Sequence, residues 1–419
     1  MTLRVLLFAV LLIVLDIYVF QAFKFAFRNS SEIVQKTTTI IFWSMTAFCV
    51  GVLLVSRVYD WDLWPKALKT YAGAFIFVLT FSKIFILIFL LTDDIFRGGR
   101  WAFDKLFSSP AKADALKGIP ANGITRSDFL VRTGIVLASL PFVSLIYGMV
   151  RGAYDYQVKR VKLKLPNIPA GFNGYKIVQI SDLDVGSFVS TEPLEEAVKI
   201  INELKPDLIL FTGDLVNNKA EEVLPHKPAL SKLKAKHGIY STLGNHDYGD
   251  YVMWDSPEEK MNNLRTLINH HREMGWDILL DEHRHVEHNG DKITLIGVQN
   301  YSMHLRFPKY GSLPKATKDI QYSDFNILLS HDPSHWRGEV LKDFSNIHLT
   351  LAGHTHGFQF GVELPNFKWS PVQYVYKEWA GLYSEAHQHL YVNRGLGFLG
   401  YPGRVGILPE ITVFELEKA

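Results

Sequence analysis

The chain has 419 residues, too many for one ordinary domain, and its net charge of +2 gives no reason to expect nucleic acid as a main partner. Its single cysteine, Cys49, lies in an apolar run, which excludes a disulfide framework and a cysteine-based zinc site. Apolar residues make up 48% of the chain, but the long apolar runs come early and most of the histidines come late. This asymmetry separates an N-terminal region from a C-terminal domain.

Four apolar segments in the N-terminal third reach the length of a bilayer-spanning helix, about 20 residues. They are Leu3–Phe23, Thr37–Ser56, Tyr71–Thr92 and Thr133–Val150. A signal peptide explains only the first segment. Buried soluble helices are a poor match for four such runs joined by short loops that contain Trp and Arg. The sequence therefore predicts a transmembrane region of about four helices over residues 1–152.

Two ionisable residues, Asp16 and Lys83, fall inside these predicted spans. Intramembrane charges are costly and tend to face a partner, so one interpretation is a functional buried pair or polar path. The other is that both side chains snorkel or lie near the bundle interior, with no role beyond assembly. The assembly interpretation is favoured, because four helices without internal repetition make a poor transporter.

Basic residues set the expected orientation. The loop between the third and fourth predicted spans carries Arg97, Arg100, Lys105, Lys112, Lys117, Arg126 and Arg132. The positive-inside rule places this loop in the cytoplasm and sends the C-terminal domain to the extracytoplasmic side. The opposite orientation is favoured by basic residues just past the fourth span: Arg151, Lys159, Arg160, Lys162 and Lys164.

From residue 153 onward, short β-branched runs alternate with helix-like stretches, which predicts an α/β domain over residues 153–419. The predicted strands are Lys176–Ser181, Asp207–Thr212, Gly238–Leu243, Lys292–Val298, Asn326–Ser330 and His348–Ala352. Helices are predicted over Thr191–Leu204, with Thr191 as the N-cap, and over Pro257–Met274.

Side chains that bind metals follow five of these strands. They are Asp182 and Asp184, then Asp214, Asn245, His331, and finally His354 and His356. Ligands bind at the carboxyl ends of strands in α/β sheets, so these side chains are expected to share one cleft. Oxygen and imidazole donors without sulfur suit Mn, Fe or Zn rather than a thiolate-bound structural zinc. One such motif alone is a turn or a helix cap in most proteins, but five in this order predict a metal site.

These elements resemble the signature of the calcineurin-like metallophosphoesterase superfamily: D-x-H, GD, GNHD/E, a single His and GHTH. The matching stretches are Asp182-Leu183-Asp184, Gly213-Asp214, Gly244-Asn245-His246-Asp247, His331 and Gly353-His354-Thr355-His356. The later stretches around Asn393–Gly397 and Pro409–Ile411 look like the branch of membrane-associated phosphodiesterases. The resemblance implies a four-layer α/β/β/α sandwich, a class of α/β fold, that hydrolyses phosphate esters.

The resemblance also implies two divalent metal ions, of Mn, Fe, Zn or Mg, and a residue set that holds them. One ion would be held by Asp182, Asp184, Asp214 and His356, and the other by Asp214, Asn245, His331 and His354. Two such ions activate a bridging water for attack on phosphorus. His246 would stabilise the phosphoryl charge or protonate the leaving group, oriented by Asp247.

The first element departs from the family pattern, because Asp184 stands where the family has His. A carboxylate still binds a hard cation and favours Mn²⁺ or Mg²⁺. We therefore expect a working but altered first metal site, in which Asp184→His raises turnover only slightly. A crippled site is the alternative.

The predicted function is a membrane-anchored phosphoesterase that cleaves phosphodiester or pyrophosphate bonds of substrates at the bilayer, such as lipid-linked phosphate esters. The alternative is a non-catalytic membrane scaffold or sensor with a degenerate fold of the same family. Asp184 favours that alternative, whereas the intact His246 and Asp214 oppose it.

Three further groups have open interpretations. His283, His285 and His288 precede an Asn289-Gly290 hairpin signal, so surface histidines are favoured over a second metal site. The aromatic residues Tyr301, Phe307 and Tyr310 line a substrate groove or pack a loop. Arg394 contacts a substrate phosphate or pairs with a carboxylate.

Overall fold

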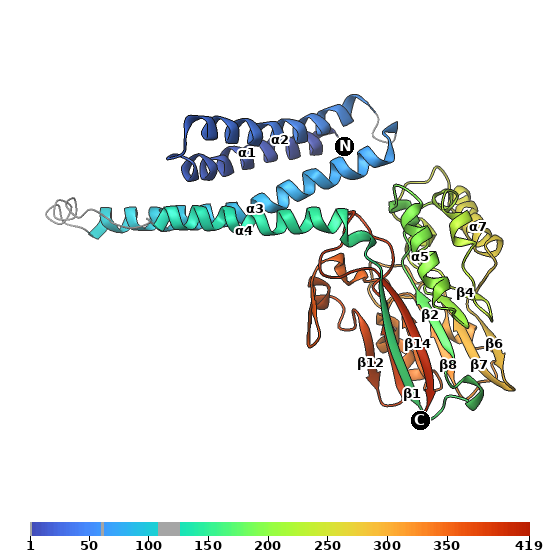
Figure 1. Ribbon diagram of the computed structural model, residues 1–419. Coiled ribbons are helices and arrows are strands. Elements are labelled where there is room, and N and C mark those ends of the chain that lie inside the picture. The colour runs from blue at the N-terminus through green and yellow to red at the C-terminus, as the bar shows by residue number, and fades with distance from the viewer. Residues whose placement is uncertain (1, 60–62, 108–125) are drawn as a thin grey trace. The chain divides into compact units, whose positions relative to one another are not determined.

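The computed structural model describes residues 2–59, 63–107 and 126–419 and divides into two compact units (Figure 1). The first unit is Met1–Tyr147 and the second is Gly148–Ala419. Lys112 and Lys117, two of the basic residues in the predicted loop between the third and fourth spans, lie outside the described residues.

The first unit consists mainly of long apolar helices. They are α1 (Thr2–Ala26), α2 (Glu32–Val58), α3 (Lys66–Phe107) and α4 (Arg126–Val150). Each is long and apolar enough to cross a membrane, which confirms the four predicted spans. Ser31 begins α2, where its hydroxyl accepts a hydrogen bond from the Val34 N–H. Many large apolar side chains on these helices are exposed, as expected of a surface that contacts lipid.

Helix α3 continues well past the predicted span Tyr71–Thr92. Beyond that span, Arg97 pairs with Asp93 at i,i+4 and with Asp94 at i,i+3. Such pairs support a helix through a polar stretch. The loss of apolar residues therefore marks the end of the span without ending the helix.

Asp16 and Lys83 meet inside the first unit. The Lys83 Nζ lies 2.7 Å from Asp16 Oδ1, and the Thr46 hydroxyl donates to the other carboxylate oxygen. Asp16 is only 2% exposed, so this ion pair is buried among the helices. Each charge satisfies the other, as the buried-pair interpretation expects.

Two six-stranded sheets form the second unit (Figure 1). The first sheet contains, in spatial order, β1 (Gln157–Leu165), β14 (Glu410–Lys418), β2 (Lys176–Ile180), β3 (Leu208–Phe211), β4 (Ile239–Ser241) and β5 (Trp276–Ile278). The second contains β12 (Gly381–Glu385), β13 (Gln388–Val392), β9 (Leu349–Ala352), β8 (Asn326–Leu329), β7 (Asp291–Gly297) and β6 (Glu282–His288). Strands β2 to β5 run parallel, as do β7, β8, β9 and β13, so their carboxyl ends lie at a common edge of each sheet.

The hydrophobic core shows that the two sheets pack face to face. Ile177 of β2, Leu329 of β8 and Leu351 of β9 belong to one buried cluster. The neighbouring Val178 of β2 points to the other face of its sheet and joins a second cluster with α5 (Glu192–Glu203) and α7 (Pro257–Glu273). The strands contain continuous runs of apolar residues because both faces of the sheet are covered.

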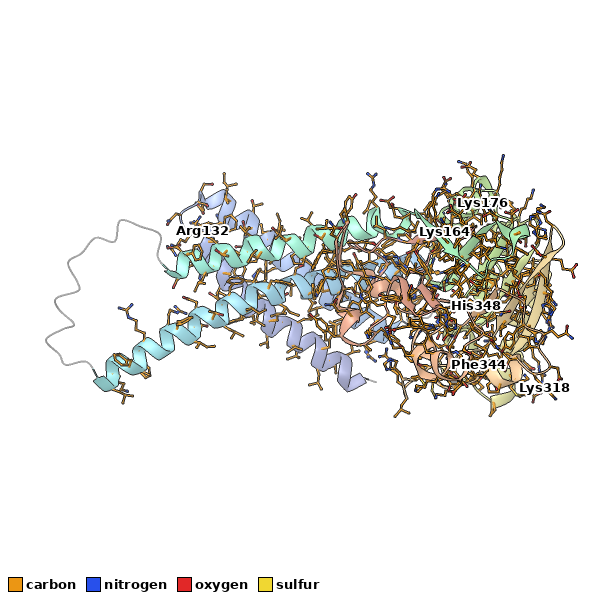
Figure 2. The ribbon with its side chains drawn as sticks, turned by 90° about the horizontal axis from the view of Figure 1, so that it is seen from below. Arg132, Lys164, Lys176, Lys318, Phe344 and His348 are labelled. Carbon is orange, nitrogen blue, oxygen red and sulfur yellow. The ribbon has the colours of Figure 1, made fainter. Side chains whose placement is uncertain are left out.

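A thinner layer covers the outer face of the second sheet. There Leu328 of β8 packs with Leu313 of the short helix α8 (Leu313–Ala316) and with Trp336. The remaining short elements are α6 (Lys227–Leu230), a π-helical turn (Trp336–Val340), α9 (Leu341–Asp343), and the hairpin strands β10 (Val362–Leu364) and β11 (Phe367–Trp369). The side chains of this unit are densely crowded in Figure 2. The predicted α/β class with layers in the order α/β/β/α is confirmed.

Every predicted strand is present, with ends that differ by one or two residues. Thr191 takes the N-cap position of α5, but its hydroxyl makes no capping bond and contacts the Pro225 carbonyl and His226 instead. Strands β1, β5 and β10 to β14 were not predicted from the sequence.

Candidate metal centre

The seven expected ligand residues all lie just beyond strand ends, and they come from both sheets. Asp182, Asp184, Asp214 and Asn245 follow β2, β3 and β4 of the first sheet. His331, His354 and His356 follow β8 and β9 of the second sheet. The face-to-face packing of the sheets brings these edges together, so the loops from both converge on one site.

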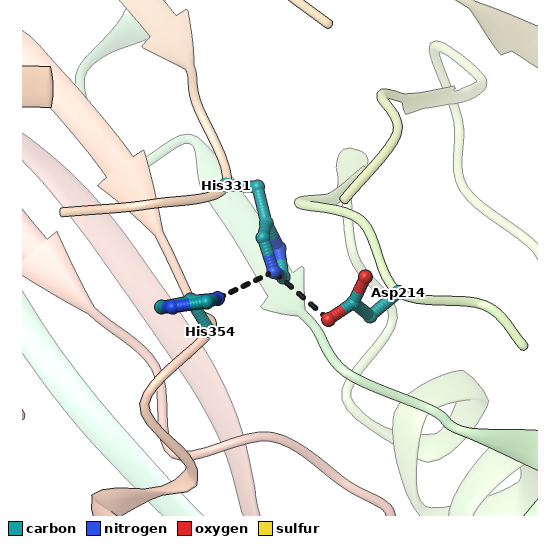
Figure 3. Close-up of side chains that lie close together, drawn as sticks. All are labelled: Asp214, His331 and His354. Atoms are coloured by element: carbon teal, nitrogen blue, oxygen red, sulfur yellow. Dashed lines mark hydrogen bonds and ion pairs between the residues drawn. The ribbon is translucent and has the colours of Figure 1, made fainter. Parts of the chain in front are cut away.

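Asp214, His331 and His354 form the tightest group of ligand atoms in the described part of the chain (Figure 3). One ligand atom of each lies within 4.8 Å of the others. The His331 Nε2 is 2.9 Å from Asp214 Oδ2 and 3.3 Å from the His354 Nδ1. The other ring nitrogen of His331, Nδ1, is 2.8 Å from the Thr212 carbonyl, which accepts its proton and leaves Nε2 to face the group.

A second group lies on the side of β2. The His356 Nε2 is 3.4 Å from Asp182 Oδ1 and 3.2 Å from Asp184 Oδ2. Both carboxylates are fully buried. The Asp182 carboxylate also accepts the backbone N–H of His354, which ties the loop after β2 to the loop after β9.

Buried acceptors without hydrogen-bond partners show that cations fit this site. Neither oxygen of Asp184 accepts a hydrogen bond, and the same is true of Asn245 Oδ1. The amide nitrogen of Asn245 donates to the Tyr251 hydroxyl, which fixes the direction of its free oxygen. Buried polar atoms are nearly always satisfied, and an unpaired buried carboxylate is especially unfavourable. Divalent metal ions satisfy oxygen donors of this kind.

The electrostatics of the cluster lead to the same conclusion. Burial, with the nearby Asp214 charge, raises the pKa of Asp182 to about 6 and holds the pKa of Asp184 well above its usual range. Burial lowers the pKa of His354 to about 4 and that of His356 well below its usual range. His354 and His356 are therefore neutral imidazoles that offer lone pairs. His331 differs, because its pairing with Asp214 overcomes the effect of burial and raises its pKa to about 10. A protonated His331 supplies part of the positive charge that the crowded carboxylates need, so the set matches a cation site.

Five of the seven expected ligands have left-handed backbone conformations. Their φ angles are 49° at Asp182, 43° at Asp184, 58° at Asp214, 71° at His354 and 47° at His356. This region is unfavourable for residues other than Gly, Asn and Asp, and such conformations gather at functional sites. The surrounding loops hold these side chains in place against that cost.

Glycines leave space for the carboxylates. A Cβ on Gly244 would lie 2.3 Å from Asp214 Oδ1, and one on Gly353 would lie 2.1 Å from Asp182 Oδ2. Each glycine is therefore required by the close approach of a ligand from a neighbouring loop.

His246 and Asp247, the expected catalytic pair, do not act together as predicted. The His246 Nδ1 lies 2.7 Å from the Asn217 carbonyl, while the Asp247 carboxylate accepts backbone N–H groups of Asp214, Leu215, Val216 and Gly244. The prediction that Asp247 orients His246 is wrong. Asp247 instead holds the loops that carry Asp214 and Asn245, because a buried carboxylate can satisfy several N–H donors at once.

Tyr376 and Asp332 belong to the site but were missed in the sequence. The Tyr376 hydroxyl lies 2.8 Å from the His354 Nε2 and donates to Asp332 Oδ2 at 3.1 Å. Such outer contacts fix the ring orientation of a ligand histidine. Asp332 directly follows His331, which was the only available signal; nothing around Tyr376 marks it.

Arg404 was also missed. Its guanidinium is buried and donates to the carbonyls of Arg394, Gly395 and Gly397, which belong to the Asn393–Gly397 stretch. That stretch is bonded to the loop after β2, since the Gly397 N–H donates to the Asp182 carbonyl. Arg394 itself pairs with Glu410 and Glu363, as one of its two interpretations expected.

The other residues singled out in the sequence are histidines of β6 and three aromatic residues, and only one of them contacts the metal centre. His283 bonds to the Ala316 carbonyl and His285 to Thr294, so the histidines of β6 have separate partners. Tyr301 stacks on His335 and Tyr310 stacks on Tyr248, which are packing contacts with the loops after β8 and β4. Phe307 differs, because its ring meets His354 edge-on at 4.7 Å.

Comparison with known proteins agrees with this geometry. Residues 175–358 match the family model described as calcineurin-like phosphoesterase, and residues 3–153 match one described as probable calcineurin-like phosphoesterase, transmembrane domain. The uncharacterized metallophosphoesterase YkuE of Bacillus subtilis is 34% identical over 65% of this chain and 90% of its own length. The transmembrane protein with metallophosphoesterase domain of Danio rerio is 30% identical over 69% of this chain, and the match spans 63% of that relative. The chain is therefore an integral membrane member of the calcineurin-like metallophosphoesterase family, whose members use divalent metal ions.

Proposed function

We propose that this protein is a membrane-anchored phosphoesterase that hydrolyses phosphodiester or pyrophosphate bonds of lipid-linked substrates with two divalent metal ions. Residues 1–152 would act as its membrane region and residues 153–419 as its catalytic domain. The observation that carries the proposal is the set of unsatisfied buried acceptors, Asp184 and Asn245, on either side of Asp214.

Two overlapping sets of residues would hold the ions. Asp182, Asp184, Asp214 and His356 form the first set, and Asp214, Asn245, His331 and His354 form the second. Bound divalent ions supply an activated water and a positive clamp for phosphoryl oxygens. Manganese, iron, zinc and magnesium all suit a donor set of carboxylates, an amide oxygen and imidazoles.

His246 is the proposed catalytic residue beside the metals. Its backbone N–H donates to Asp214 Oδ1 at 2.7 Å, and its Nδ1 is held by the Asn217 carbonyl. The carbonyl bond places the proton on Nδ1 and leaves Nε2 as the nitrogen that contacts substrate. A histidine held in this way stabilises phosphoryl charge or passes a proton to the leaving oxygen.

Arg306 supports substrates with a second anionic group. Its guanidinium lies 4.5 Å from the Phe307 ring centroid, and Phe307 contacts His354. Burial raises the pKa of Tyr251, which bonds to Asn245, to about 12, and the charge of Arg306 opposes that rise. Among the described residues Arg306 has no ion-pair partner, so its charge is available to a second phosphate.

Exposed apolar side chains in the same loops support lipid-linked substrates. Met253, Leu305 and Phe358 are among the exposed large apolar residues, and each lies within two positions of a residue at the site. Exposed apolar groups around a binding site mark contact with an apolar partner. Only six residues, Arg151–Tyr156, separate α4 from β1, so the catalytic domain is tethered to the membrane by a short linker. The basic loop before α4 leads us to propose the extracytoplasmic side for the catalytic domain.

The test is hydrolysis of bis-p-nitrophenyl phosphate by the full-length protein in detergent with Mn²⁺, against an Asp214→Asn control. We expect turnover that the control abolishes. The absence of turnover with Mn²⁺, Fe²⁺, Zn²⁺ and Mg²⁺ would contradict the proposal and favour a non-catalytic scaffold, the function that Asp184 in place of His would suit.

A second experiment compares a lipid pyrophosphate with a soluble diester to identify the class of substrate. Arg306→Gln should lower kcat/KM at least about tenfold for a lipid pyrophosphate in mixed micelles and leave the soluble diester unchanged. Replacing Met253, Leu305 and Phe358 by serine should raise KM for the micellar substrate alone. Leu224→Ser, which alters an exposed leucine outside these loops, is the matched control.

A further inference from the structure

Arg404 and Asp184 lie on opposite sides of the same imidazole ring. Arg404 Nη2 is 3.4 Å from the His356 Nδ1, and Asp184 Oδ2 is 3.2 Å from the His356 Nε2. Arg404 is 1% exposed, and Asp184 is fully buried. A buried positive charge and a buried negative charge are thus separated by one ring.

Neither charge has a conventional partner. The Arg404 guanidinium contacts backbone carbonyls and His356, and none of the described carboxylates forms an ion pair with it. Asp184 accepts no hydrogen bond. Arg404 attracts Asp182 and Asp184, and this attraction offsets part of the cost of burying the guanidinium and the Asp184 carboxylate.

The number of negative charges at the site suggests what Arg404 does for Asp184. Asp184 stands where the family pattern has a neutral histidine, so the chain carries one extra negative charge next to Asp182 and Asp214. Three buried carboxylates in one site repel one another. A fixed guanidinium beside the extra carboxylate restores the balance without occupying a ligand position.

We propose that Arg404 is a positioning residue that compensates the charge of Asp184, which keeps the metal-free site folded and moderates its affinity for cations. The proposal rests on the metal site of the proposed function, but it concerns charge balance and not catalysis.

Two glycines fix the backbone of Arg404. The Arg404 N–H donates to the Gly148 carbonyl at 3.1 Å, and a Cβ on Gly152 would lie 2.0 Å from the Arg404 carbonyl oxygen. A Cβ on Gly148 would lie 2.7 Å from Val405 Cγ2. The last turn of α4 and the turn after it therefore form the surface on which the Arg404 segment rests, all within the second unit.

A double-mutant cycle tests the coupling in the full-length protein in detergent. The variants are Arg404→Gln, Asp184→Asn and the double change, and the measurements are the Kd for Mn²⁺ by calorimetry and the metal-free unfolding temperature. Removing the positive charge should lower the metal-free unfolding temperature and tighten Mn²⁺ binding about tenfold. Removing the carboxylate should weaken binding, and the two changes together should depart from additivity by at least about fivefold in Kd.

A matched control is available in Arg394, which is buried to a similar degree but pairs with Glu410 and Glu363. Arg394→Gln combined with Asp184→Asn should be additive. Additive effects at Arg404 and Asp184 as well would overturn the proposal. Because no substrate is used, that result is distinct from a failure to hydrolyse phosphate esters.

Two further variants keep the test decisive if Arg404→Gln does not fold. Arg404→Lys retains the charge, so its Mn²⁺ affinity should stay within about threefold of wild type. Gly152→Ala should displace Arg404 and tighten Mn²⁺ binding, and this effect should vanish when Asp184→Asn is also present. An equal effect of Gly152→Ala in both backgrounds would contradict the proposal.

Discussion

The Tyr376 hydroxyl lies 2.8 Å from the His354 Nε2 and 3.1 Å from Asp332 Oδ2. This bridge joins the outer nitrogen of an expected metal ligand to a buried carboxylate. Tyr376→Phe removes the bridge without changing the ring. We expect metal affinity to fall about 10- to 100-fold with little change in the metal-free unfolding temperature. The measurement is Mn²⁺ binding by calorimetry, and Tyr374→Phe, at an exposed tyrosine nearby in sequence, should bind like wild type.

His246 and Asp247 should respond differently to substitution, because one is free at Nε2 and the other holds four backbone N–H groups. We expect His246→Gln to lower turnover about 10²- to 10⁴-fold with normal metal content and normal unfolding temperature. Asp247→Asn should instead lower the unfolding temperature and the metal content together. Metal analysis and thermal unfolding of the two purified variants distinguish these outcomes. A stable, metal-loaded, inactive Asp247→Asn protein would restore a direct catalytic role for Asp247.

The buried pair of Asp16 and Lys83 should dominate the stability of the helical unit. Asp16→Asn leaves a buried ammonium group without its partner and should cost about 3–5 kcal/mol. The double change Asp16→Asn with Lys83→Met removes both charges and should recover most of that loss. Thermal unfolding in detergent measures the cycle, and Lys36→Met, which breaks an exposed pair with Glu32, is the control. Equal losses for the single and double variants would show that the pair is not coupled.

His271 should make the second unit sensitive to acid. Burial lowers its pKa to about 3, and its ring packs on Phe211 and Trp276 while Nδ1 contacts Ser241. The unfolded chain has a higher His pKa, about 6.5, so it binds the proton first as the pH falls. Stability from this residue is therefore present above about pH 6.5 and is lost as the pH falls toward 3.

From pH 7 to pH 5 the loss from His271 amounts to about 2 kcal/mol. The measurement compares unfolding temperatures of metal-free wild type and His271→Leu at both pH values. We expect the gap between them to change by about 4 °C in favour of the variant at pH 5. An unchanged gap would mean that His271 is not the residue that senses acid.

The positions of the expected ligands could be predicted because each depends on local sequence. Short apolar runs in the sequence predict strands such as β2 and β8. In a parallel sheet, the residues that follow such strands lie at their carboxyl ends. Asp182 and His331 were placed by this rule alone. The structure adds the distances, and the roles of these residues as ligands remain predictions.

Other features depend on contacts between distant segments. In strand β1, Lys162 and Lys164 alternate with Val161, Leu163 and Leu165, so this strand signal was present and was missed. Its partner, β14, lies at the far end of the chain. Tyr376 and Arg404 stand in loops without a motif and reach the site only through tertiary packing. The family resemblance assigned Asp247 to His246, yet in the turn His246–Tyr248 the two side chains bond to different partners.

The left-handed backbone at Asp182, Asp184, Asp214, His354 and His356 has a consequence for redesign of this protein. A procedure that ranks residues by compatibility with the backbone would favour glycine at these positions, and asparagine as well in place of His354 and His356, since these replacements relieve the strain. Each such replacement would raise the stability of the empty fold while it erased a donor atom. Consensus or stability-guided engineering of this chain should therefore hold these five positions fixed, because stability and chemistry select opposite residues there.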